Sequence, residues 1–452
     1  MAFKFVPIDR DTPYIFPPCV QDYLPEDHLA RFVVDIVDKL NLSHLSEAYA
    51  GKGSKAYPPA MLVALLFYGY ATGVFSSRKL EKATYDSIAV RFICANTNPD
   101  HDTIARFRKR FLKELEELFV EILLIAKTMG LITLGTISLD GTKIKANASK
   151  HRALSWDYAN RLEKQLQEEV EELLRLAEEA DHSSLPEEMD IPEELKRREQ
   201  RLAVIEKAKK EIEARARERF ECEQEDYEEK VARRRAYEDT TGNKARGKEP
   251  TPPTPGPRSK DQVNLTDEES RIMPSSSGGF EQAYNGQAAV DIETHLIVEQ
   301  HVTQHTNDKK EIAPALENIA GLPKELGKAK NLLADTGYFS EANVALCTDM
   351  NIEPLIPEKR DKHNLPLKER FKDDPEPMEN PTAVQVMEYR LKTKEGKSLY
   401  AKRKSTVETV FGIIKHVQGF RQFLLRGLES VQSEWTLVCI GWNLKRMHAL
   451  SS

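Results

Sequence analysis

The stretch ISLDGTKIKAN, residues 137–147, is the part of the sequence that decides the predicted fold. Its apolar residues Ile137, Leu139 and Ile144 flank Asp140 in an extended pattern that predicts a β-strand. A long charged segment follows, and β-rich sequence resumes only near Leu265. The fold therefore depends on how this early strand joins elements that lie more than a hundred residues downstream.

The sequence after Leu265 alternates between strands and helices. Residues 283–292 and 296–304 are β-rich runs joined by a turn, which predicts a hairpin. The next predicted elements are a helix at 308–319, a strand at 330–334, a helix at 340–350, a strand at 352–356, and helices at 405–417 and 428–450. Added to the first strand, this order predicts an α/β core of the ribonuclease H-like kind, a mixed five-stranded sheet with flanking helices.

The charged segment after the first strand predicts a helical insert. It carries two apolar stripes separated by a Ser-Ser-Leu-Pro break, the pattern of an antiparallel helical hairpin or short coiled coil. The ends of a hairpin lie close together, so the core tolerates the insertion. We therefore expect an all-α N-terminal domain at 1–130, a catalytic core at 131–156 and 265–452, the helical hairpin at 157–240, and a disordered Pro/Gly-rich linker at 241–264.

The N-terminal 130 residues are predicted to be helical. One buried helix begins at Pro58-Pro59 and ends at Gly73, and one long helix is expected from Asp102 to about residue 130 with a basic first part. Short helices with a basic leading edge fit a helix-turn-helix-like DNA module. A helical dimerisation bundle explains the same pattern equally well.

The net charge of −7 over 452 residues argues against a nucleic-acid binder only while the chain is taken as a whole. From Asp157 to Pro250 there are 28 acidic and 20 basic residues, whereas Val386 to Ser452 holds 12 Lys and Arg against 5 Asp and Glu. The acidity is confined to one segment and the C-terminal segment is basic, so the overall charge does not exclude DNA as a partner.

Composition predicts a cytoplasmic protein. The most apolar stretch, 61–70, is much shorter than the about 20 residues that cross a bilayer, and the first residues lack the apolar core of a secretory signal. The five Cys residues are scattered and never spaced as CxxC. This argues against a disulfide framework or a zinc site and fits a reducing cytosol.

Three acidic residues occupy matching places in the predicted sheet. Asp140 lies in the first strand, Asp335 directly follows the fourth, and Glu408 lies on the helix after the fifth. In a ribonuclease H-like sheet these positions converge. Phosphodiester cleavage needs an activated water and a stabilised leaving oxygen, which two Mg²⁺ ions about 4 Å apart supply through hard oxygen ligands. We predict that Asp140 bridges both ions and that Asp335 and Glu408 hold one each, with Mn²⁺ able to substitute.

Each acid also has a simpler explanation. Asp140-Gly141 and Asp335-Thr336-Gly337 are turn sequences, and the dipole of a helix favours an acid such as Glu408 in its first turn. Taken singly, these explanations outweigh catalysis. The joint match to the strand order favours a catalytic triad.

With these positions in place, the sequence resembles the DDE transposases of bacterial insertion sequences, in the branch with a Tyr-Arg-Glu-Lys signature. The matching stretches are SLDGTKIKANASKH around Asp140, GGFEQAYNGQAAVD at 278–291, LLADTGYFS around Asp335, and the segment that begins at Tyr400. The N-terminal NPDHDTIARFRKRF is similar too. Only the insert and the linker fall outside the resemblance.

The resemblance assigns DNA-contacting roles to the C-terminal segment, where the signature is matched by Tyr400, Arg403, Glu408 and Lys415. The family has three residues between Arg and Glu, whereas this chain has four, and Lys404 stands at the regular distance, so either cation fits. Lys415, two helical turns after Glu408, is placed to hold a DNA phosphate beside the metals. Arg421 and Arg426 extend the basic surface.

The resemblance implies a transposase that binds the terminal inverted repeats of its own element, cleaves the ends with Mg²⁺ and transfers the freed 3′-hydroxyls to target DNA. It also implies no covalent protein–DNA intermediate and a homodimer on paired ends, with the insert as a candidate for holding DNA or pairing protomers. The alternatives are a domesticated, inactive DNA-binding protein, a helical scaffold protein, and a structure-specific nuclease on the same fold. Cleavage with Mg²⁺, salt-dependent DNA binding and strand joining separate them.

Overall fold

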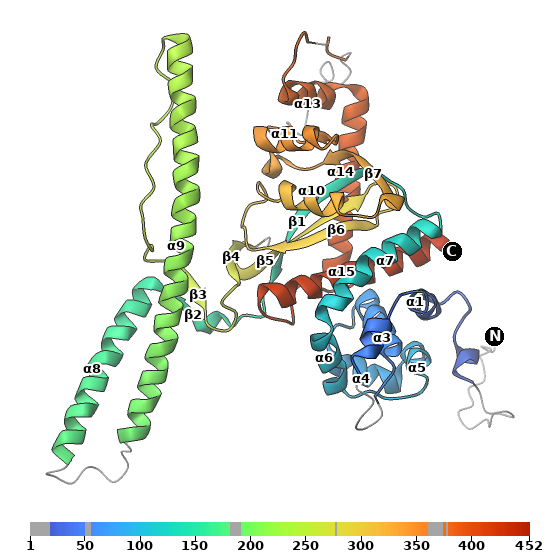
Figure 1. The fold of residues 1–452 in the computed structure, drawn as a ribbon, viewed down its shortest axis with the longest axis horizontal. Helices are drawn as coiled ribbons and strands as arrows, with labels where there is room; N and C mark the ends of the chain where they lie inside the picture. Colours follow the sequence, from blue (N-terminus) through green and yellow to red (C-terminus); the bar gives the residue numbers. More distant parts are fainter. Residues whose placement is uncertain (1–18, 50–55, 181–190, 276–277, 360–373, 377) are drawn as a thin grey trace, which may run out of the picture. The chain divides into compact units, whose positions relative to one another are not determined.

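The computed structural model describes residues 19–49, 56–180, 191–275, 278–359, 374–376 and 378–452 (Figure 1). The chain forms two compact units, one made of residues 1–145 and 284–452 and the other of residues 146–283. It is a mixed α/β protein with a mixed sheet and an N-terminal helical region.

A mixed sheet is the centre of the first unit. Its strands are β1 (Leu134–Lys145), β5 (Phe280–Asp291), β6 (Ile297–Thr303), β7 (Gly327–Leu333) and β8 (Glu353–Leu355), and β4 (Arg271–Pro274) pairs with residues 280–283 of β5. The order along the sheet is β4-β5-β1-β7-β8, with β6 also paired to β5. β1, β7 and β8 run parallel, and β5 and β6 are antiparallel. The expectation that the first and fourth strands of the core are neighbours is confirmed by the β1–β7 pair.

The helices that cover this sheet all follow β6 in the chain. They are α10 (Ile312–Ala320), α11 (Glu341–Asp349), α13 (Ala383–Lys392), α14 (Lys394–Gly412) with the π-helical turn η5 (Ile413–Val417), and α15 (Leu428–Ser451). The 3-10 segments η3 (Lys324–Leu326) and η4 (Thr336–Tyr338) flank β7. α14 therefore begins about three turns before the helix that the sequence predicted at 405–417. It packs on β1, and α15 packs on β6.

α15 also joins the sheet to the N-terminal helices. It contacts α3 (Pro59–Thr72) and α7 (Leu112–Thr128), and its buried Trp435 donates from Nε1 to the Gln287 carbonyl oxygen at 3.0 Å. A Cβ on Gly441 would lie 2.8 Å from the backbone of Tyr70 and Ala71, so only glycine permits this close approach of the two helices. The N-terminal helices and the sheet thus form one packed body.

The remaining N-terminal elements are η1 (Val20–Tyr23), α1 (Leu29–Val37), α2 (Ser43–Glu47), α4 (Ser77–Asp86), α5 (Ile88–Ile93) and α6 (His101–Arg110). The prediction of one long helix after Asp102 was wrong, because the chain breaks at Phe111, where φ is −114° and ψ is 32°. The Phe111 ring is buried against Phe107 and Tyr49, which holds this non-helical conformation between α6 and α7.

Among the described residues, no single helix is long and apolar enough to cross a membrane. The pair α3 and α4 reaches that length and composition only together, with a bend of 98° between them.

The second unit is built on a helical hairpin. β2 (Ala153–Ser155) pairs antiparallel with β3 (Gln262–Asn264), so the two ends of the insert meet, and η2 (Lys150–Arg152) precedes β2. α8 (Trp156–Ala180) packs on α9 (Ile191–Thr241). Their shared core contains Leu166, Ile205 and Ile212.

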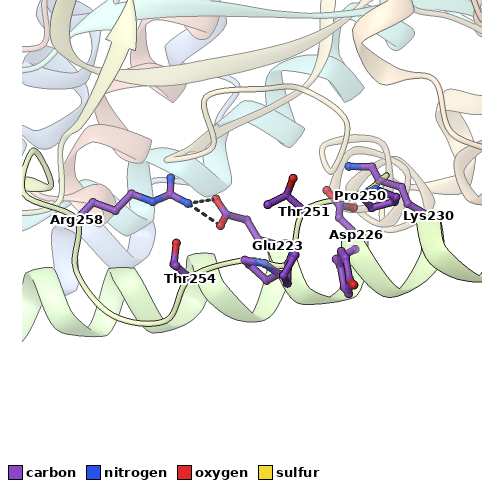
Figure 2. A pocket seen from close by; sticks show the side chains of 10 residues that line it. Glu223, Asp226, Lys230, Pro250, Thr251, Thr254 and Arg258 are labelled. Atoms are coloured by element: carbon purple, nitrogen blue, oxygen red, sulfur yellow. Dashed lines mark hydrogen bonds and ion pairs between the residues drawn. The ribbon is translucent and has the colours of Figure 1, made fainter. Parts of the chain in front are cut away.

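Residues 241–264, expected to be a disordered linker, instead return along α9. We call residues 242–261 the strap. The Arg234 guanidinium donates to the carbonyl oxygens of Ala245 and Lys248, both at 3.1 Å, and Arg258 pairs with Glu223 at 2.7 Å (Figure 2). Arg219 pairs with Asp261 at 2.7 Å. The Arg side chains satisfy strap carbonyls and carboxylates that would otherwise need water, and a cavity of about 390 Å³ remains between strap and helix.

Candidate active site

Asp140 lies in the central strand of the sheet, held there by its buried neighbours. Leu139 and Ile144 are fully buried, and the Asp140 side chain is 18% exposed. Burial raises the pKa of the Asp140 carboxyl to about 7, and the negative charges of Asp335 and Asp308 add to the rise. The backbone N–H of Gly141 and the charge of Arg403 act in the opposite direction. The charged form of the Asp140 carboxylate is therefore disfavoured unless positive charge lies nearby.

Asp335 reaches the same edge through the parallel register of β1 and β7. Ser138 is paired with Leu333, and Asp140 and Asp335 each stand two residues beyond that pair. That pair is the last one between the two strands, and Asp335 beyond it is still close enough for its negative charge to contribute to the raised pKa of Asp140. The Asp335 carboxylate also caps η4, accepting from the Gly337 N–H at 2.7 Å. Its orientation is therefore fixed by the turn that the sequence Asp-Thr-Gly forms.

Arg403 links Glu408 to Asp140. The Arg403 guanidinium contacts the Asp140 carboxylate at 3.3 Å through Nη1 and the Glu408 carboxylate at 2.7 Å through Nη2. One planar group thus spans both acids, although they are 268 residues apart in the sequence. Arg403 is 10% exposed at its side chain, whereas Glu408 is 46% exposed and accessible from solvent.

The other predicted DNA-contacting residues differ in their burial and in their contacts. Lys415 is half-buried and donates to the Lys143 carbonyl oxygen at 2.8 Å, and burial together with the charge of Lys143 lowers its pKa to about 8. Tyr400 packs beside the small apolar cluster of β7 and β8. Lys404 is exposed, and Arg421 is exposed and donates to the Lys415 carbonyl oxygen at 3.0 Å. Arg403, and not Lys404, contacts the acids.

A polar network that was not predicted from the sequence lies beside Asp140. Asp308 Oδ1 accepts from Asn285 at 2.6 Å, from Gln287 at 2.7 Å and from Lys143 at 3.3 Å. The Tyr338 hydroxyl donates to the amide oxygen of Gln287. Asn285 and Gln287 are fully buried, and their alternation inside the otherwise apolar strand AYNGQAAVD was the signal that could have revealed them.

Gly141 is required by the same network. A Cβ at this position would lie 2.2 Å from the Gln287 amide nitrogen and 2.6 Å from the Asp308 carboxylate. The Gly in the stretch LDGT thus lets the polar network approach the backbone directly behind Asp140.

The donor set fits divalent cations that prefer oxygen ligands. All three residues offer carboxylate oxygens; burial, helped by the charges of Asp335 and Asp308, raises the pKa of Asp140, and Glu408 remains accessible. Within the described part of the chain, no three acidic, His or Cys side chains are already gathered closely enough to hold a metal ion. The Arg403 guanidinium contacts both Asp140 and Glu408. Coordination of metal by all three acids therefore requires the Arg403 side chain to move.

An acidic cluster at the edge of such a sheet is an arrangement that DNA-processing enzymes use for phosphoryl chemistry. Residues 251–444 match the model of the transposase DDE domain, and residues 18–110 match that of a transposase domain (DUF772). The two matches together cover more than half of the chain, which belongs to the DDE transposases of the insertion-sequence type. No curated protein and no solved structure gives a match.

The resemblance seen in the sequence is thereby confirmed at the level of the family. The DDE-domain match includes Asp335 and Glu408 but begins after Asp140, because the helical insert separates the first strand from the rest of the core. The pairing of β1 with β7 is what places Asp140 next to the matched segment.

Proposed function

We propose that the protein catalyses Mg²⁺-dependent cleavage at the ends of an insertion sequence and transfers the freed 3′-hydroxyls to target DNA. The observation that carries the proposal is the Arg403 guanidinium, which contacts both Asp140 and Glu408. The parallel pairing of β1 with β7 supports a place for Asp335 beside Asp140. The strand order and directions support a ribonuclease H-like core, which the family match leaves open.

In this proposal Asp140, Asp335 and Glu408 would be the carboxylates that hold the Mg²⁺ ions. Bound divalent cations would supply an activated water and stabilise the leaving oxygen. Arg403 holds the buried Asp140 side chain in place and favours its charged form, and Lys143 and Asp308 fix the strand that carries it. Lys415, whose amino group lies beside this strand, is positioned to hold a DNA phosphate.

The partners in this proposal are the terminal inverted repeats and the target DNA. The proposal includes a homodimer on paired ends that acts in the cytoplasm on nucleoid DNA. The basic end of α6 and the early helices serve either DNA binding or dimerisation.

The test uses a plasmid that carries the reading frame with its native flanking DNA. Purified protein with Mg²⁺ is expected to cut at the element ends and to join them to a second plasmid, and Mn²⁺ is expected to replace Mg²⁺. Asp140→Asn, Asp335→Asn and Glu408→Gln should each abolish both steps while DNA binding in EDTA remains. Cutting without joining would indicate a nuclease, and binding without cutting by the wild type would indicate a domesticated DNA-binding protein.

A further inference from the structure

The helical insert is acidic as a whole, but its charge changes sign near the far end of α9. From Asp157 to Glu229 acidic residues outnumber basic ones by 25 to 13, whereas Lys230 to Pro250 holds 7 Lys and Arg against 3 Asp and Glu. This basic part comprises the last turns of α9 and the first half of the strap. Lys230 is 18 residues beyond Ile212, or about 27 Å along the helix from the hairpin core. Packing of that core does not explain the basic part.

A groove of about 540 Å³ lies between the last turns of α9 and the strap. Five of its eight lining residues are basic and none is acidic: Lys230, Arg233, Arg234, Arg246 and Lys248. Lys230 and Pro250 also line the neighbouring cavity of Figure 2. The groove is therefore a concentrated positive surface on an otherwise acidic unit.

The five cations are not equivalent. Arg234 fastens the strap through its bonds to the backbone, and Arg233 pairs with Glu229 at 2.9 Å. Lys230, Arg246 and Lys248 are exposed, and in the described residues no carboxylate lies within ion-pair distance of them. Arg234 thus holds the strap in place, and the charge of Arg233 is neutralised by Glu229. The other three cations present charge that no carboxylate neutralises.

We propose that this groove binds the sugar-phosphate backbone of duplex DNA. Closely spaced phosphates match a group of cations in a groove that no carboxylate lines, and the release of counterions from DNA favours the contact whatever the base sequence. The Pro-rich strap stiffens one wall, so the Arg246 and Lys248 backbone is ordered before DNA arrives. The groove gives the insert a DNA-holding role. The inference rests on the proposed function only in that the enzyme acts on DNA.

The experiment measures binding of the full-length protein to a fluorescent duplex of random sequence in EDTA, over a range of KCl concentrations. The variant Lys230→Ala/Arg246→Ala/Lys248→Ala removes the three unbalanced charges. If each contacts a phosphate, the slope of log K against log salt falls by about 2.7, and affinity at 0.1 M KCl falls by up to about 500-fold. A fall in slope of at least about 1 with a tenfold loss of affinity supports the groove.

A matched control lies on the same helix. Arg197, Lys207 and Lys210 are exposed too, but each is paired with a carboxylate at 2.8 Å or less. Their triple replacement by Ala removes the same formal charge and should leave the salt slope unchanged. Equal losses in both variants, or none in the groove variant, overturn the proposal. So does a groove variant that changes the oligomeric state and leaves DNA affinity intact, because the occupant is then a second copy of the chain.

Wild-type protein provides a measurement that does not depend on folding of any variant. Bound duplex should protect Lys230 and Lys248 from acetylation by an amine-reactive reagent and leave Lys207 and Lys210 reactive. Equal modification of Lys230 and Lys248 with and without DNA overturns the proposal. Both measurements are made without divalent metal. Their results therefore do not depend on whether the site around Asp140 cleaves DNA.

Discussion

Replacing Asp140 by Asn should abolish cleavage and at the same time stabilise the protein at alkaline pH when no divalent metal is present. The ordinary pKa of an Asp is 3.8, and the Asp140 pKa in the folded protein is about 7. The folded state therefore holds this proton more tightly than the unfolded chain does. Stability is retained at acid pH and falls as the pH rises toward 7.

The size of the effect follows from this shift. One pKa unit corresponds to about 1.36 kcal/mol, so between pH 5 and pH 8 the wild type loses about 3 kcal/mol relative to Asp140→Asn. For a unit of this size that is a difference of about 5 °C in Tm. The Asp140 side chain is mostly buried, so little of the effect is lost to solvent screening.

The assay compares thermal unfolding of wild type and Asp140→Asn in EDTA at several pH values. Other titrating groups are common to both proteins and cancel in the difference. Asp100→Asn is the control of opposite sign, since the Thr103 N–H lowers the pKa of the Asp100 carboxylate at the start of α6 and Asn preserves the helix cap. Parallel pH curves for wild type and Asp140→Asn, or a variant less stable at pH 8, would refute the idea of a buried carboxylate strained by its neighbours.

Three further predictions concern the same site. Mg²⁺ or Mn²⁺ at pH 8 should raise the Tm of the wild type but not of Glu408→Gln, as measured by thermal shift without DNA; an equal rise in both would remove Glu408 from the metal site. Gly141→Ala should cost about 1–3 kcal/mol in urea or thermal unfolding, because its Cβ enters the Gln287–Asp308 network, whereas Gly135→Ala in the same strand, with open space around its Cβ, should cost less than about 0.5 kcal/mol. Arg403→Ala should reduce the cleavage rate at least about 100-fold while Lys404→Ala stays within a few fold; the reverse result would show that Lys404 serves as the signature cation.

The strands were predictable because short apolar runs ending in Asp-Gly or Asp-Thr-Gly identify them locally. The family was predictable because Asp335, Glu408 and their surroundings are local motifs. The network around Asp308 was not predictable in the same way. It joins β1, β5 and the segment before α10, and only the tertiary arrangement brings these partners to one oxygen.

The strap and the break at Phe111 show the same limit. Pro and Gly content predicted disorder, but the capture of backbone carbonyls by Arg234, 11 and 14 residues earlier, depends on the length and direction of α9. Continuous apolar periodicity predicted one helix through Phe111. The helix is interrupted there because the Phe111 ring is buried against two other aromatic rings. In both cases a contact that local sequence does not encode outweighs local propensity.

The choice between Arg403 and Lys404 could, however, have been made from the sequence. Motif spacing favours Lys404, but the helix buries Val407, Val410, Phe411 and Ile414, and steps of 4, 7, 8 and 11 residues lead back from them to Arg403. Lys404 lies 100° around the helix and is exposed. A long guanidinium chain at the edge of the buried stripe can pass beneath the helix and reach both carboxylates, whereas an ammonium group on the solvent side cannot. The apolar stripe determines which cation faces the sheet. The extra residue between Arg403 and Glu408 therefore changes the spacing of the motif, but the cation that contacts the acids is still an Arg.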